Sequence, residues 1–228
     1  MYFSLPELSA EQRNKLLHST IVPRPIAWIV TRNPSGAVNV APFSFFNVLA
    51  GDPPILCVCI GSRQGRLKDT ALNIAATGEF VVNLVSASQA RRMNVTAIEF
   101  PQEVDEAAEA GLQLVDCHSV GVPRIEDSPA SYECRTRQSI DIDGRRSLVI
   151  ADIVGAYITD KAIVDREAMH FDPVPMDLIA RLHNPGWYCQ VKDPFQLVTP
   201  SVDRWEAIKQ TDPALASLRA PVGDGDRA

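Results

Sequence analysis

Two segments of the chain carry side chains whose types and spacing could bind a ligand. The first, GSRQGRLKDT, places Ser62, Arg63, Lys68 and Thr70 within nine residues, close to an expected helix start. Hydroxyls, cations and the free amides of a helix N-terminus all favour a phosphate. Composition alone also fits a simpler interpretation, in which the cations are exposed and Thr70 or Asp69 belongs to a helix cap. The segment is therefore a candidate phosphate site with a surface alternative.

The second segment, APFSFFN at residues 41–47, combines three phenylalanines with Pro42, Ser44 and Asn47. The aromatic rings predict a buried element, whereas the proline, hydroxyl and amide favour turns and unpaired backbone.

Other kinds of chemistry find little support in the sequence. No serine lies in GxSxG, and His18, His118, His170 and His183 stand in separate segments without an HExxH motif. No GxGxxG or GxxxxGK[ST] loop is present. The closest cysteine pair lies in ILCVCI, where alternate strand residues pack as small apolar groups. We therefore expect no metal site, no Rossmann loop and no Walker loop.

Charge and composition narrow the class of protein further. The net charge is −6 and the isoelectric point is near 5.2, without a basic stripe, so nucleic acid is not an expected partner. Five cysteines are an odd number, and no charged leader precedes an apolar signal core. No apolar run reaches the about 20 residues of a membrane helix. The sequence predicts a soluble, cytoplasmic protein with reduced thiols.

The elements that must position these segments are mostly strands. A capping box at Ser9 and Gln12 predicts a first helix, and Asp143-Gly144 predicts a long hairpin. Strand pairs with inserted helices favour a mainly β fold, an antiparallel β-barrel with peripheral helices. We expect one domain over residues 1–200 and a polar tail over 201–228, loosely ordered or laid on a partner. The expected helices are 10–17, 66–76 (ended by Gly78), 88–95 and 102–110, and the expected strands are 26–31, 37–41, 55–60, 79–84, 130–141 and 147–159.

Several motifs in fixed order resemble the flavin reductase-like FMN-binding proteins, a split β-barrel family. They are VPRPIAWIVT (22–31), NVAPFSFFNVLAGDPPIL (39–56), KDTALNI (68–74), GEFVVNLV (78–85), EDSPASYEC (126–134) and ARLHNPGWY (180–188). The resemblance covers about residues 16–190 and rests on the combination of PRPIAW, APFSFFN and KDT. It implies a split barrel, bound FMN and a homodimer that completes the flavin pocket.

The resemblance also implies a set of cofactor-binding residues. The segment Ala41–Asn47 would offer backbone amides and polar side chains to the flavin ring or ribityl chain, and Thr31 would face the same pocket. Arg24 is either a ligand or part of a structural ion pair. The implied cofactor-binding residues are Arg24, Thr31, Ala41, Pro42, Phe43, Ser44, Asn47, Ser62, Arg63, Lys68 and Thr70.

One segment departs from the family pattern. Related proteins often carry two glycines after Arg-Leu, whereas Arg181-Leu182 is followed here by His183, Asn184 and Pro185. The added bulk predicts that the segment 183–188 gates access to the flavin, so the family's usual substrate cannot be assumed. His183 is also the candidate proton donor, because imidazole titrates near neutral pH; a third interpretation is a surface loop.

The sequence thus predicts an FMN-binding oxidoreductase. It would take a hydride from NADH or NADPH and pass electrons through FMN to a small-molecule acceptor or a partner oxygenase. Two alternatives remain: an FMN-bound electron carrier or flavin store without NAD(P)H turnover, and a flavoenzyme with its own organic substrate. No ribose-recognition motif distinguishes NADH from NADPH.

Overall fold

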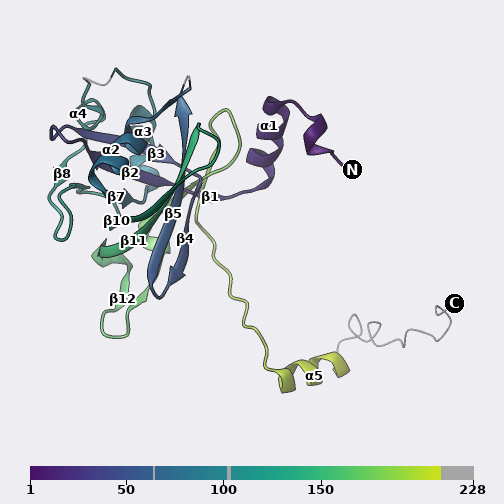
Figure 1. The fold of residues 1–228 in the computed structure, drawn as a ribbon. Coiled ribbons are helices and arrows are strands. Elements are labelled where there is room, and N and C mark those ends of the chain that lie inside the picture. The colour runs from purple at the N-terminus through teal and green to yellow at the C-terminus, as the bar shows by residue number, and fades with distance from the viewer. Residues whose placement is uncertain (64, 102–103, 212–228) are drawn as a thin grey trace. The chain divides into compact units, whose positions relative to one another are not determined.

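An antiparallel sheet of eight strands dominates residues 1–192 of the computed structural model (Figure 1). The structure describes residues 1–63, 65–101 and 104–211, and it divides the chain into the units 1–192 and 193–228. The sheet runs in the order β3-β2-β7-β10-β11-β5-β4, with β6 paired to β5. Its strands are β2 (Ala27–Arg32), β3 (Val38–Phe43), β4 (Phe46–Gly51), β5 (Pro54–Arg63), β6 (Arg66–Leu67), β7 (Glu79–Asn83), β10 (Ala130–Asp141) and β11 (Arg146–Ile158).

Smaller sheets and helices surround these strands. The second sheet contains β1 (Arg24–Pro25), β14 (Ile179–Arg181) and β15 (Tyr188–Gln190), and two short pairs are β8 (Leu114–Val115) with β9 (Arg124–Ile125) and β12 (Ile163–Asp165) with β13 (His170–Phe171). The α-helices are α1 (Ala10–Thr20), α2 (Asp69–Thr77), α3 (Ala90–Val95), α4 (Glu106–Glu109) and α5 (Val202–Thr211). Short 3₁₀ turns lie at Leu5–Glu7, Ala87–Gln89, Asp160–Ala162 and Val174–Met176. None of the helices in the described ranges is long and apolar enough to cross a membrane.

The two edge strands of the main sheet are neighbours in the sequence. β3 and β4 stand at opposite ends of the strand order, yet only Ser44 and Phe45 separate them. The sheet must therefore curl until its two edges approach each other. Two register shifts in the β10–β11 pair, after Glu133 and after Thr136, contribute to this curvature. Each of these edge strands pairs with one other strand of the sheet. The backbone N–H and C=O groups of APFSFFN that point away from that partner are therefore not paired within the sheet.

Two apolar cores lie on the two faces of the central strands. The inner one contains Ile29, Val58, Phe80 and Val82, and the outer one contains Trp28, Val30, Val81 and Met93, covered by α3 and α4. β2 is buried on both faces, which explains its continuous apolar sequence. The mainly β prediction is confirmed.

Local signals account for most of the predicted elements. The hairpin over 26–31 and 37–41 appears as β2 and β3, 130–141 is β10, and the expected strand 147–159 is β11, displaced by one residue. Both hydrogen bonds of the Ser9–Gln12 capping box are present. Gly78 closes α2 with a positive φ of 72°, as a C-terminal glycine should.

Several expectations differ from the structure. α2 begins at Asp69 rather than at residue 66, because Arg66 and Leu67 form β6 against the end of β5. The strand β4 was not expected, because the turn residues of APFSFFN obscured it; it pairs with β5. Of the expected helix 102–110, only Glu106–Glu109 is helical, capped by the Asp105 side chain, and residues 102–103 lie outside the described residues.

The expected tail contains a helix. In the unit 193–228, α5 spans Val202–Thr211, and its first turn is capped where the Ser201 hydroxyl accepts the Arg204 amide at 3.3 Å. A lysine–glutamate pair three residues apart, Lys209 and Glu206, supports the last turns. The serine was a local signal for this helix. Residues 212–228 of the expected tail lie outside the described residues.

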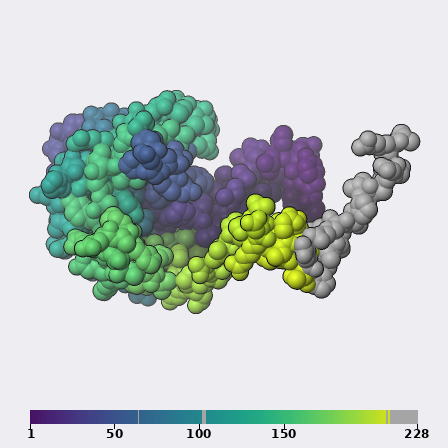
Figure 2. All heavy atoms as spheres, turned by 90° about the horizontal axis from the view of Figure 1, so that it is seen from below, coloured from purple at the N-terminus to yellow at the C-terminus, as the bar shows by residue number. Residues whose placement is uncertain are grey.

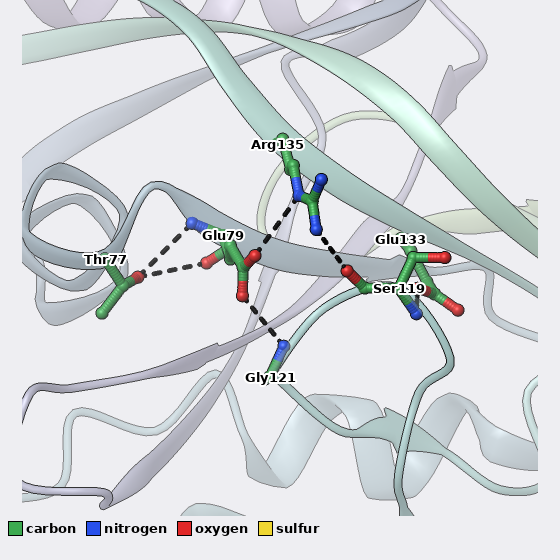
Figure 3. A network of polar contacts seen from close by, with 6 residues as sticks. All are labelled: Thr77, Glu79, Ser119, Gly121, Glu133 and Arg135. Atoms are coloured by element: carbon green, nitrogen blue, oxygen red, sulfur yellow. Dashed lines mark hydrogen bonds and ion pairs between the residues drawn. The ribbon is translucent and has the colours of Figure 1, made fainter.

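Two carboxylates fix the loop over residues 116–122 to the sheet (Figure 3). Glu133, only 1% exposed, accepts hydrogen bonds from the backbone amides of His118 and Ser119. Glu79 accepts one from the Gly121 amide at 2.9 Å and pairs with Arg135, which donates to the Ser119 carbonyl (Figure 3). These two glutamates thus satisfy loop amides, and they belong to the framework of the fold.

The helix α1 is the least packed element of the first unit. None of its residues is buried, and Figures 1 and 2 show the N-terminal residues (purple) projecting from the strands. A helix of this length does not persist in water through its own hydrogen bonds, so its stability must come from contacts at its ends. The principal contact is with Arg24, described below.

Candidate functional site

A cavity of about 760 Å³ lies where the basic segment approaches the strand β3. Its walls are Asn39, Ala41 and Pro42 of β3, the β5–β6–α2 connection, the segment after α3, and Glu106 of α4. Trp28 positions the segment after α3, because its indole Nε1 donates to the Thr96 hydroxyl at 2.8 Å in the core. The cavity therefore joins residues from four separate stretches of the chain.

The basic segment supplies three cations to this cavity. Arg63, Arg66 and Lys68 all line it, as does Thr70 at the first turn of α2. Lys68 is the N-cap residue of α2, and its side chain makes no capping hydrogen bond. The N-terminus of a nine-residue helix thus opens beside three positive charges, which is a favourable environment for a phosphate.

The three cations differ in their partners. Arg63 Nε lies 2.9 Å from the Glu99 carboxylate, and the two side chains are 40% and 61% exposed. An exposed pair of this kind stabilises the fold little, so an anionic ligand can replace Glu99 at small cost. In the described part of the chain, Arg66 and Lys68 have no carboxylate within ion-pair distance of their side chains.

Ser62 was also expected to bind the phosphate, but it is not among the residues that line the cavity. It belongs to β5, where it pairs with Leu67 of β6. The short β5–β6 turn is what brings Arg63 and Arg66 opposite each other in register. Arg66 was considered only as a surface charge in the sequence; its position at the cavity follows from this pairing.

The aromatic segment contributes to the cavity mainly through its first residues. Ala41 and Pro42 line it, and the buried Phe43 ring lies below Lys68, whose Nζ is 5.5 Å from the ring centroid. Ser44 is half-buried in the turn to β4, and the exposed Asn47 accepts a hydrogen bond from the Val48 amide at 2.9 Å. Neither Ser44 nor Asn47 is part of the cavity lining.

Thr31 and Arg24 lie in the interior, away from the cavity. Thr31 is fully buried, and its hydroxyl accepts a hydrogen bond from the Asn73 side chain of α2 at 3.0 Å. Arg24 donates to the carbonyl oxygens of His18, Ile21 and Leu182 at 2.9, 2.7 and 2.6 Å. Arg24 therefore satisfies the C-terminal end of α1 and ties it to β14, through carbonyls rather than through an ion pair.

His183 belongs to a second cluster, built from the β14–β15 hairpin and α1. Its ring stacks on Trp187 with centroids 5.6 Å apart, and its Nδ1 lies 2.8 Å from the Asn184 carbonyl oxygen. The Asn184 side chain lies 3.3 Å from the His18 ring, which in turn packs on Phe45 at 5.4 Å. The hairpin and the turn of APFSFFN therefore both contact α1. Burial lowers the pKa of His18, and the charges of Arg24 and Arg181 lower it further.

Asn39 and Glu106 are two of the cavity residues that sequence reasoning missed. Asn39 lies two residues before Ala41 on β3, so strand alternation was a signal for it. The Asn39 amide can be oriented in two ways, and only one of them avoids placing acceptor against acceptor and donor against donor. In that orientation its oxygen accepts from Thr70 Oγ1 at 3.0 Å and its nitrogen donates to Glu106 Oε1 at 3.2 Å. Glu106 had no local signal, because only tertiary packing brings α4 to β3.

Glu106 and Asp69 are half-buried carboxyl groups of this cavity. Burial raises the pKa of Glu106, the charges of Asp69 and Asp105 raise it further, and hydrogen bonds from backbone amides only partly oppose the shift. No group of three or more His, Cys, Asp or Glu side chains that could hold a metal ion occurs within the described ranges.

The family model of the flavin reductase like domain matches residues 18–173. An uncharacterized protein of Deinococcus radiodurans is 39% identical over 211 residues, which covers 90% of this chain and 92% of that protein. The solved structure of 2-nitrobenzoate 2-nitroreductase NbaA from Pseudomonas fluorescens is 32% identical, with a TM-score of 0.81 over 89% of this chain and 98% of that one.

Two further structures are similar in fold. Nitrilotriacetate monooxygenase component B from Bacillus cereus is 26% identical, with a TM-score of 0.81 over 86% of this chain and 98% of that one. A protein with a split barrel domain from Shewanella frigidimarina is 21% identical, with a TM-score of 0.76 over 88% of this chain and 100% of that one. The curled sheet with adjacent edge strands is therefore a split barrel, as predicted.

Proposed function

The chain belongs to the flavin reductase like domain family, and we propose that it is an FMN-binding oxidoreductase whose phosphate site is the cavity beside Lys68. The family assignment agrees with the resemblance carried by the sequence motifs, and it supports a flavin-related oxidoreductase with a flavin cofactor. The choice of FMN, the electron donor and the assembly are the parts that we propose.

The observation that carries this proposal is the meeting of the basic segment with the edge strand β3. Arg63, Arg66 and Lys68 line the same cavity as Ala41 and Pro42. The donor set fits a flavin mononucleotide, since it offers cations and helix amides for one phosphate and an edge strand with an apolar ring beside it for the rest of the ligand. Among the described residues, no second basic cluster lines the cavity, which favours one phosphate over two.

When bound, the flavin supplies the hydride and electron transfer chemistry. The residues of this chain bind and orient it. Lys68 and Arg66 would hold the anionic end, and the amides at the start of α2 favour negative charge there. The buried Thr70 hydroxyl donates to Asn39 and so positions the Asn39 amide at the cavity. The buried Phe43 ring excludes water beneath Lys68. Hydride transfer requires no side-chain acid or base, so none is assigned.

We infer that the electron donor is NADH or NADPH. The similar structures support two kinds of electron acceptor. Likeness to a monooxygenase component B supports delivery of electrons to a partner oxygenase, and likeness to a nitroreductase supports reduction of an organic substrate by this chain itself. An electron carrier or flavin store that does not oxidise NAD(P)H is the non-enzymatic alternative.

We further propose a homodimer that completes the flavin site. The apolar side chains of Ile21 at the end of α1, Phe45 in the β3–β4 turn, and Val48 and Leu49 on the edge strand β4 are 62%, 49%, 60% and 55% exposed. An unpaired edge and a helix without buried residues both favour coverage by a second copy.

An anaerobic titration tests the enzymatic proposal. The purified chain is loaded with FMN, its flavin absorbance is recorded, and NADH or NADPH is added in the absence and then in the presence of excess free flavin. Bleaching of the flavin band followed by steady oxidation of one nicotinamide is the expected result. Tight FMN binding without bleaching by either nicotinamide contradicts the reductase and favours the carrier, whereas absence of flavin binding contradicts the whole proposal.

A further inference from the structure

Glu106 is an acidic residue that lies close to the cations of the proposed phosphate site. It lines the cavity together with Lys68 and Thr70. The Asn39 amide connects the two sides, because it accepts from the Thr70 hydroxyl at 3.0 Å and donates to Glu106 Oε1 at 3.2 Å. Glu106 is thus two hydrogen bonds away from the first turn of α2, where the phosphate would bind.

The carboxylate of Glu106 has acceptor capacity that the protein leaves unfilled. An ionised carboxylate has about four lone-pair directions, whereas the donors to Glu106 among the described residues are the Asn39 side chain and the backbone amides of Val40 and Glu106 itself. The carboxyl group is half-buried, and burial raises its pKa. A half-buried charge that keeps a free acceptor direction is stabilised by a ligand group that donates to it.

The charges around Glu106 indicate which ligand group can approach it. Its own helix carries Asp105 and Glu109, α2 carries Asp69 and Lys68, the β5–β6 turn carries Arg63 and Arg66, and the segment after α3 carries Glu99. Asp69 and Asp105 both raise the pKa of Glu106. A phosphate beside Glu106 would be repelled by these carboxylates, whereas a hydroxyl group would donate to one of them.

We propose that Glu106 is a specificity-determining residue that accepts hydrogen bonds from hydroxyl groups of the flavin's sugar-alcohol chain. The inference rests on the proposed function of the cavity and deepens it. In FMN the hydroxyl groups of the sugar-alcohol chain lie next to the phosphate. In the cavity Glu106 lies next to the proposed phosphate site, to which Asn39 and Thr70 connect it. The cavity then recognises two features separately: cations bind the phosphate, and Glu106 binds the hydroxyl groups.

Three flavins separate these two features. FMN has the chain and the phosphate, riboflavin has the chain alone, and lumiflavin has neither. Their dissociation constants are measured by quenching of flavin fluorescence, without any nicotinamide, for the wild-type chain and the variants Glu106→Ala and Glu106→Gln. Glu109→Gln is the matched control, because Glu109 is exposed on the same short helix.

We expect Glu106→Ala to weaken FMN and riboflavin by a similar factor of about 10 and to leave lumiflavin unchanged. Glu106→Gln should give a smaller loss for both, since its amide oxygen still accepts. Lys68→Ala should show the opposite selectivity, with a loss for FMN alone. Glu109→Gln should resemble the wild type with every flavin.

Three results would overturn the inference. They are unchanged FMN and riboflavin affinity in Glu106→Ala, an equal loss for lumiflavin, and tighter FMN binding in Glu106→Gln, which would mean that Glu106 only repels the phosphate. If the wild-type chain binds none of the three flavins, the proposed function fails instead, so the two failures are distinguishable.

Discussion

The ammonium group of Lys68 lies 5.5 Å from the centroid of the Phe43 ring. The contact joins the basic segment to the aromatic segment, which are separated by β4 and β5 in the sequence. A cation over an aromatic face is attracted by the ring, and here the ring also holds the ammonium group at the cavity wall. The relationship places a cation of the proposed phosphate site beside an apolar ring, as we would expect of a flavin site.

The first prediction concerns the phosphate. Replacing Arg63 and Lys68 together by alanine removes two cations from the cavity wall. Each charge-assisted hydrogen bond contributes about 1.5–3 kcal/mol, so FMN affinity should fall at least about 100-fold. Riboflavin affinity should change less than about 3-fold, because that ligand lacks the phosphate. Equal losses for both ligands, measured by fluorescence quenching, would count against the site.

The second prediction concerns assembly. Light scattering should give twice the chain mass of 25.0 kDa at micromolar concentration. Leu49→Asp, on the exposed face of β4, should shift the mass toward one chain and weaken FMN binding, because a charge at an apolar interface is costly. Val164→Asp serves as control, since Val164 is 59% exposed on β12. A wild-type monomer that still binds FMN would contradict the proposal.

The third prediction concerns the His183–Tyr188 segment, which we propose gates access to the flavin. Replacing His183 by glycine removes the ring that stacks on Trp187. If the segment only obstructs access, the reduced flavin should reduce bulky acceptors several-fold faster in this variant, and the rate with small acceptors should be unchanged. His170→Gly, in the exposed strand β13, is the control.

The same variant distinguishes gating from proton donation. If His183 donates a proton, His183→Gly should slow turnover with every acceptor and remove the pH dependence near neutrality. Unchanged rates with small and large acceptors across the pH range would leave only a surface loop. In that case the segment does not belong to the site.

The fourth prediction concerns acid stability. Burial raises the pKa of Glu133, but the amides of His118 and Ser119 and the Tyr157 hydroxyl donate to it and bring the net pKa below its ordinary value. A group with a lowered folded pKa stabilises the fold above its unfolded pKa, and this stability is lost as the pH falls through the folded value. Glu133→Gln should therefore lower the free energy of unfolding at pH 7 by about 1–3 kcal/mol.

Urea unfolding at several pH values tests this fourth prediction. The difference between the wild type and Glu133→Gln should shrink as the pH falls below about 4.3, the ordinary value of a glutamate. Glu126→Gln is the matched control, because Glu126 is exposed and should show no such dependence. A difference that stays constant from pH 7 to pH 3 would contradict the role given to the carboxylate.

Local patterns in the sequence determined the elements and their ends. The Ser9 and Gln12 capping box forms as expected, Gly78 ends α2 with a positive φ, and strand alternation gave β2, β3 and β10. These signals are strong because each depends on hydrogen bonds or side-chain alternation within a few residues. The family motifs were equally visible, since they are short and keep their order.

Tertiary structure decided which of these residues face the cavity. Thr31 and Arg24 carry suitable polar groups, yet Thr31 binds Asn73 and Arg24 binds three carbonyls. Glu106 reaches the cavity only because α4 packs on β3. The face that a strand residue presents follows from alternation, but the ligand or neighbour that it meets there depends on how the sheet curls. That curvature is set by pairings between strands far apart in the sequence, which no local pattern encodes.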